Sequence, residues 1–109
     1  MADAAAARGH RYLAITDHSR HSRVANGLDP DRLARQIDEI DRLNAELDGI
    51  RLLKGSEVDI LEDGSLDLPD DILSRLDLRV CSLHHRLDLA EAKQTERVIR
   101  AMDNPWFNI

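Results

Sequence analysis

Three side chains of the kinds that bind metal ions accompany apolar stretches of the sequence. His18 follows the run YLAIT, Glu57 lies within IRLLKGSEVDIL, and His84 follows LRVCSL. Imidazole nitrogens and carboxylate oxygens are ligands expected for zinc, manganese or iron, and a carboxylate can bridge two ions because it has two oxygens. Bound ions lower the pKa of their water and neutralise phosphate oxygens. Metal-dependent phosphoester chemistry is therefore one hypothesis for this chain.

Each of these residues also has an ordinary structural explanation. A histidine after a strand is commonly a hydrogen-bonded structural group, and Asp17, beside His18, could cap or orient a loop. Glu57 could lie on the surface if its strand is at an edge. Metal ligands on separate strands do not form a short sequence motif that could be recognised by its spacing. The metal hypothesis therefore depends on the expectation that the three side chains come together in the folded chain.

The apolar pattern changes period along the chain and predicts alternating strands and helices. Strands are expected at 12–16, at 50–61 as one strand or a pair, and at 78–85, and helices at 2–8, 29–48, 68–76 and 88–104. Short, continuous apolar strands separated by helices are typical of a parallel sheet covered by helices, which predicts an α/β fold. The carboxyl ends of parallel strands share one edge, where ligands collect, so the three side chains should converge there. In the last helix we expect a buried face that includes Leu89, Ala92, Val98 and Met102.

Composition limits the classes of protein to be considered. The chain has 109 residues, of which 42% are hydrophobic and 33% charged, as expected for a single globular domain. A net charge of −6 argues against binding nucleic acid by electrostatics alone, so ions would have to attract any phosphate. The single cysteine, Cys81, excludes an internal disulfide and fits a reducing compartment. No apolar run is long enough to span a bilayer and MADAAAARGH lacks the features of a secretory signal, so we expect a cytoplasmic protein without a membrane partner.

Other polar residues are weaker candidates for the site. His85 should point away from His84 if the chain is extended there. His21, in the loop after TDHS, could approach a phosphate, but a solvated loop residue is the simpler interpretation. Arg20 and Arg23 could contact a substrate phosphate, and the burial of Lys54 depends on whether its strand lies at an edge, but surface charge is the simpler interpretation of all three. His10 is expected to be an imidazole at a helix end, and Cys81 a packing residue.

Three long stretches carry a family resemblance. YLAITDHSRHSRVANGL, GIRLLKGSEVDILEDGSLDLPDDIL and LDLRVCSLHHRL resemble the polymerase and histidinol phosphatase (PHP) domain found at the C-terminal end of bacterial family X DNA polymerases, most specifically in TDHS, GSEVDILEDGSLD and SLH. The resemblance implies a distorted seven-stranded barrel, (β/α)7, that holds three metal ions, commonly zinc or manganese. It also implies hydrolysis of phosphoester bonds and, in the polymerase setting, 3′-5′ exonuclease activity or related processing of DNA ends.

The resemblance also implies roles for individual residues. By position, His18 would bind one ion, Glu57 would bridge two others, and His84 would bind one of those two, which places Glu57 and His84 in the catalytic centre. Asp17 would orient or polarise its neighbour, because a ligating imidazole usually needs a partner for its other nitrogen.

The other ligand motifs of that family have no counterpart in this chain. A His-x-His motif would precede residue 1, and Gly-His-Pro and Asp-x-His motifs would follow WFNI. We therefore predict an internal fragment, about half of the barrel, with an incomplete ligand set, weak metal binding and little or no hydrolysis by the isolated chain. Its DNA or phosphoester substrate would be bound through the longer parent protein.

Half of a barrel would leave strand edges and apolar strand faces uncovered. Such a chain should self-associate into a homo-oligomer. The alternative function is therefore a non-catalytic structural or self-association module that retains PHP motifs.

Overall fold

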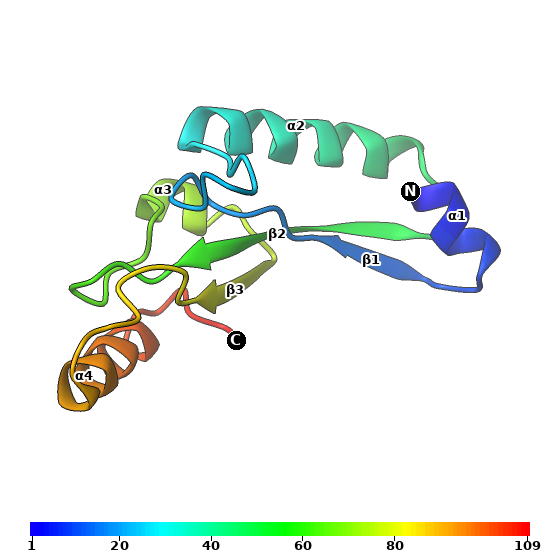
Figure 1. The fold of residues 1–109 in the computed structure, drawn as a ribbon. Coiled ribbons are helices and arrows are strands. Elements are labelled where there is room, and N and C mark those ends of the chain that lie inside the picture. Colours follow the sequence, from blue (N-terminus) through cyan, green and yellow to red (C-terminus); the bar gives the residue numbers. More distant parts are fainter.

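A three-stranded parallel sheet and four helices make up the computed structural model, which describes residues 1–109 (Figure 1). The strands, adjacent in the order β1-β2-β3, are β1 (Tyr12–Ile15), β2 (Arg51–Asp59) and β3 (Leu78–Ser82). The helices are α1 (Ala2–Ala7), α2 (Pro30–Glu46), α3 (Asp70–Leu73) and α4 (Glu91–Met102). The predicted α/β class and alternation of strands and helices are confirmed. None of the helices combines the length and hydrophobicity needed to cross a membrane.

The central strand β2 pairs with its two neighbours along different parts of its length. β1 pairs with the first part, from Tyr12 opposite Arg51 to Ile15 opposite Lys54, whereas β3 pairs with residues 55–59. Beyond β1 the chain returns to β2 in a parallel bridge between His18 and Glu57. In this bridge the Glu57 N–H donates to the Asp17 carbonyl and the Ser19 N–H donates to the Glu57 carbonyl, each at 2.9 Å. The segment after β1 therefore runs beside the end of β2.

Helix α2 covers one face of the sheet (Figure 1). It begins where the sequence predicts, because the Asp29 side chain accepts a hydrogen bond from the Arg32 N–H at 2.8 Å and Pro30 suits the first turn. Its buried side chains, at helical spacing, join a core built from α2, β2, α3, α4 and the intervening segments. The ten core residues are Leu33, Ile37, Val58, Ile60, Leu66, Leu68, Ile72, Leu73, Leu76 and Ala101.

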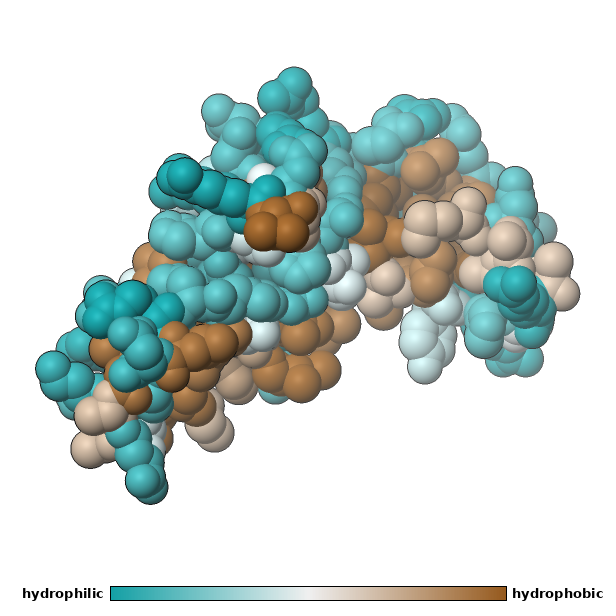
Figure 2. Space-filling model, viewed as in Figure 1, coloured by the Kyte–Doolittle hydropathy of each residue, from teal (hydrophilic) through white to brown (hydrophobic).

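The opposite face of the sheet is open. Side chains alternate along a strand, so Leu53 and Glu57 of β2 share this face with Leu78 and Val80 of β3. Leu53, Leu78 and Val80 are only half-buried and do not belong to the core. Figure 2 shows hydrophobic surface on the underside of the molecule, below the sheet. The sheet is therefore covered on one side and accessible on the other.

The buried face predicted for α4 is wrong. Ala92 is exposed, Met102 is 59% exposed, and Val98 is only half-buried, whereas the buried residues of α4 are Arg97 and Ala101. The physical reason is that α4 contacts the apolar core only through Ala101, whereas at Arg97 it faces the backbone carbonyls of residues 60 and 61, just after β2. Those carbonyls need hydrogen-bond donors, and an arginine supplies them. Leu89, also half-buried, lies before the first residue of the helix.

Candidate metal centre

His18, Glu57 and His84 meet at the carboxyl end of the sheet. One donor atom from each residue lies within 4.8 Å of the other two. Glu57 Oε1 is 3.5 Å from His18 Nε2 and 3.0 Å from His84 Nε2, and the two imidazole centroids are 5.2 Å apart. All three side chains are partly exposed, so an ion could reach them from solvent. The structure thus brings together the three residues that the sequence singles out.

A buried carboxylate lies behind one of these imidazoles. Asp59 is fully buried, and its Oδ1 is hydrogen-bonded to Nδ1 of His84. Because a carboxylate only accepts hydrogen bonds, Nδ1 of His84 carries the hydrogen, and the neutral ring then presents a lone pair at Nε2. This is the arrangement that orients histidine ligands in metal sites.

The contact between His84 and Glu57 fits a cation. In the neutral tautomer, the lone pair of His84 Nε2 faces the ionised Glu57 Oε1 across 3.0 Å, so two acceptors oppose each other. A proton or a metal ion between them removes that repulsion. Asp59 Oδ2 is also buried without a hydrogen-bond partner, which leaves further negative charge uncompensated beside the ring. The donor set therefore suits a divalent cation.

Two buried serines fix the segment that carries His18 against β2. The Ser19 Oγ accepts a hydrogen bond from the Asp59 N–H at 3.0 Å, and the Ser56 Oγ donates to the Asp17 carbonyl at 3.0 Å. These two hydrogen bonds join residues 17–19 to β2 and so fix the positions of both His18 and Asp59.

Asp17 has a different neighbour from the one expected. Its Oδ2 accepts a hydrogen bond of 2.6 Å from Gln36 Nε2 on α2, and no hydrogen bond joins it to an imidazole. The carboxylate that contacts a site imidazole from behind is Asp59, which the sequence interpretation missed. A signal was available, because residues 57 and 59 are two apart on a strand and share a face.

The weaker candidates lie apart from the three ligands or have other partners. Lys54 pairs with Asp41 at 2.9 Å, and Arg20 Nε lies 3.7 Å from Asp67 Oδ1. The Cys81 side chain packs against the core, and burial raises the pKa of its thiol to about 11, so it is a poor nucleophile and ligand at neutral pH.

The remaining four candidates differ in their contacts. The His10 and Arg23 side chains make no hydrogen bond or ion pair. His85, predicted to turn away from His84, stacks on His21.

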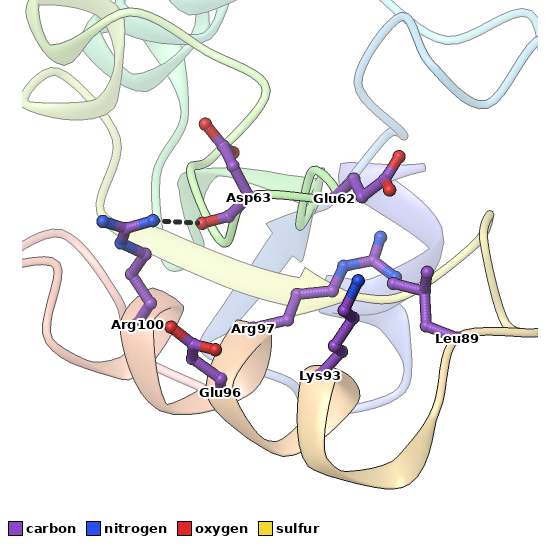
Figure 3. A pocket seen from close by; sticks show the side chains of 7 residues that line it. All are labelled: Glu62, Asp63, Leu89, Lys93, Glu96, Arg97 and Arg100. Carbon is purple, nitrogen blue, oxygen red and sulfur yellow. Dashed lines mark hydrogen bonds between the residues drawn. The ribbon is translucent and has the colours of Figure 1, made fainter.

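A separate hollow of 240 Å³ lies between α4 and the turn after β2 (Figure 3). Lys93, Arg97 and Arg100 project from α4 toward Glu62 and Asp63. Arg97 also donates to the carbonyls of residues 60, 61 and 85, at 2.6, 2.9 and 3.1 Å. The hollow contains none of the three ligands, but Arg97 fixes the segment that carries His84 against the end of β2.

Known proteins with similar sequences include a DNA polymerase/3'-5' exonuclease and several probable phosphatases. The chain is 45% identical over 109 residues to the DNA polymerase/3'-5' exonuclease PolX of Bacillus subtilis (strain 168), a match that covers 100% of the chain and 19% of that protein. It is 36% identical over 111 residues to a probable phosphatase of Acetivibrio thermocellus, covering 99% of the chain and 44% of the relative. A probable phosphatase of Thermoanaerobacter sp. (strain X514) is 40% identical over 72 residues, which cover 62% of the chain and 29% of the relative.

The chain is therefore homologous to PolX and to these probable phosphatases. It spans less than half the length of each. No protein-family model matches it.

Replacing Asp59 by asparagine is expected to weaken metal binding by about 10- to 100-fold. Asparagine keeps an acceptor for His84 Nδ1 but removes the charge that makes the ring a stronger ligand. Calorimetric titration with Zn²⁺ measures the effect, and Asp88→Asn, at a side chain that is 80% exposed, is the control. Equal affinities of the two variants would show that Asp59 does not support the site.

Proposed function

We propose that the chain is part of a PHP-type, metal-dependent phosphoesterase in which His18, Glu57 and His84 bind divalent ions. The observation that carries this proposal is the meeting of three donor atoms within 4.8 Å at the carboxyl end of a parallel sheet. The homology to PolX and the probable phosphatases supports it. The sheet would be about half of a distorted (β/α)7 barrel, with its open face toward the barrel interior.

Each of the three ligands would have a different role in binding ions. Glu57 has two oxygens and can contact two ions, whereas His84 is oriented by Asp59 and His18 by the bridge to β2. Nitrogen and oxygen donors suit zinc or manganese. A divalent ion here would lower the pKa of bound water and neutralise phosphate oxygens.

The proposed substrate is a DNA 3′ end, by analogy with the name of the Bacillus relative. Because the chain has a net charge of −6, approach of a polyanion depends on cations at the rim. The ions would therefore serve in substrate attraction as well as in chemistry.

The open face of the sheet favours a second candidate function, self-association without catalysis. Ala14, Leu53, Leu78 and Val80 are only half-buried on that face. A second copy of the chain could cover them and form a homo-oligomer.

Metal content and mass in solution, measured on the same sample, test the two functions. The purified chain is incubated with Mn²⁺ or Zn²⁺, dialysed, and analysed by elemental mass spectrometry and light scattering. We expect weakly bound ions and, because the ligand set is incomplete, little or no hydrolysis of a 3′-labelled DNA oligonucleotide compared with the roughly 1–1,000 s⁻¹ of typical enzymes, with any residual hydrolysis stopped by a chelator. A well-folded sample that binds no ion would contradict the phosphoesterase proposal, and oligomers in that sample would favour self-association.

A further inference from the structure

The segment between β3 and α4 carries His84 but makes no backbone–backbone hydrogen bonds. None of residues 83–89 donates or accepts one. Arg86, within this segment, has a φ of +51°, in the left-handed region that residues other than glycine disfavour. A strained residue of this kind persists only where its surroundings hold it in place. Contacts from other parts of the chain therefore fix this segment and, with it, the position of His84.

Two of these contacts act on imidazole rings. Asp59 is hydrogen-bonded to the ring of His84, and the ring of His85 stacks on that of His21 with centroids 5.2 Å apart. The Nδ1 of His21 lies in turn 3.0 Å from Oδ1 of the buried Asp67. These contacts orient the rings but give the backbone carbonyls of the segment no partner.

The partner of those carbonyls is Arg97 on α4. Its side chain is buried, 1% exposed, and projects from the helix as Figure 3 shows. Nη1 donates to the carbonyls of residues 85 and 86 at 3.1 and 3.3 Å. Nη2 and Nε donate to the carbonyls of residues 60 and 61 at 2.6 and 2.9 Å. One guanidinium therefore joins the peptide units just after His84 to those just after Asp59.

Gln94, one turn earlier on the same face of α4, adds to these contacts. Its Nε2 donates to the Arg86 carbonyl at 2.7 Å, and its Oε1 accepts from Arg97 Nη1 at 3.2 Å. All hydrogen-bond partners of the Arg97 guanidinium are thus neutral oxygens. Burying a charge without an opposite charge is costly, and here hydrogen bonds to the two segments offset that cost.

The two segments that Arg97 joins carry ligands of the candidate metal centre. Arginine can join them because it has five N–H donors in a planar fork, whereas lysine has a point charge with three. We propose that Arg97 is a positioning residue for the metal centre, which sets the separation of 3.0 Å between His84 Nε2 and Glu57 Oε1. The inference rests on the proposed function, because it concerns the same ions. Arg97 itself donates to none of the three ligands.

Calorimetric titration of an Arg97→Lys variant with Zn²⁺ tests the proposal. We expect the affinity to fall about 10- to 100-fold, the usual effect of removing a group that orients a metal ligand. Arg79→Lys is the matched control, because Arg79 is also buried but donates to the carbonyls of Leu73 and Leu76, outside both ligand-bearing segments. It should leave the Zn²⁺ affinity nearly unchanged. Gln94→Ala should weaken binding about fivefold, as expected for one hydrogen bond.

A measurement without metal separates this inference from the proposed function. Ring ¹⁵N spectra, recorded where the imidazoles are neutral, report the tautomer of His84. We expect the parent chain and Arg79→Lys to show only the tautomer with hydrogen on Nδ1. Arg97→Lys should show a mixture of both tautomers, because the ring no longer stays against Asp59.

Urea denaturation establishes which variants are folded. A folded Arg97→Lys variant that binds Zn²⁺ as tightly as Arg79→Lys, or that keeps the single His84 tautomer, would overturn the proposal. If Arg97→Lys does not fold, unchanged Zn²⁺ binding by Gln94→Ala would overturn it. A parent chain that binds no Zn²⁺ would contradict the proposed function, and the ring spectra alone would then decide whether Arg97 positions His84.

Discussion

Replacing Glu57 by glutamine is expected to lower the affinity of the three-ligand site for Zn²⁺ or Mn²⁺ at least 100-fold, or about 2.8 kcal/mol at roughly 1.4 kcal/mol per tenfold change. Glu57 Oε1 is the donor that lies close to both imidazoles, 3.0 Å from His84 Nε2 and 3.5 Å from His18 Nε2. Glutamine has nearly the same shape but no charge, so it cannot neutralise a cation. Its amide hydrogens can instead bond to the lone pairs that would bind the ion.

Calorimetric titration of the parent chain and the variant measures this effect. Glu46→Gln, at a side chain on α2 that is 65% exposed, is a matched control for the change of residue type. Thermal melting without metal shows whether the fold is retained. A Glu57→Gln variant that melts like the parent and binds Zn²⁺ equally well would refute the role of Glu57 as a ligand.

Much of the fold could be predicted because the signals are local. Continuous apolar runs gave the three strands, and Asp29 followed by Pro30 gave the start of α2. The meeting of His18, Glu57 and His84 could be anticipated from one topological rule, that parallel strands end at the same edge. The distances among their donor atoms could not, because they depend on the register of β2 with its two neighbours.

The supporting carboxylates were harder to identify from the sequence. The spacing of residues 57 and 59 places Asp59 on the same strand face as Glu57, but local sequence does not show which of the 21 acidic residues are buried. Asp59 contacts His84 because β2 pairs with β3 so that Asp59 lies opposite Ser82. Asp67 reaches His21 because the chain folds back through an antiparallel bridge between Ile60 and Leu66. Burial of charged residues is a tertiary property, and the same holds for Arg97 in α4.

Replacing Gly27 by alanine is expected to destabilise the chain by roughly 3 kcal/mol. A Cβ at this position would lie 1.8 Å from the carbonyl oxygen of Ser19, 2.5 Å from its carbonyl carbon and 3.1 Å from the Cα of Arg20. These are backbone atoms, so no side chain can turn aside. The Ser19–Leu28 bridge would have to open, and with it the 2.7 Å hydrogen bond from the Leu28 N–H to the His18 carbonyl. Metal affinity should therefore fall together with stability.

Urea denaturation of Gly27→Ala and Gly49→Ala separates close packing from backbone strain. Gly49 has a φ of +79° but would place its Cβ where nothing lies within 4 Å, so alanine there should cost only about 1–2 kcal/mol and leave metal binding unchanged. Judged by the sign of φ alone, Gly49→Ala would be the more destabilising substitution, because Gly49 has a positive φ and Gly27 does not. If Gly27→Ala is as stable as Gly49→Ala, the close contact between residues 19 and 27 does not hold His18 in place.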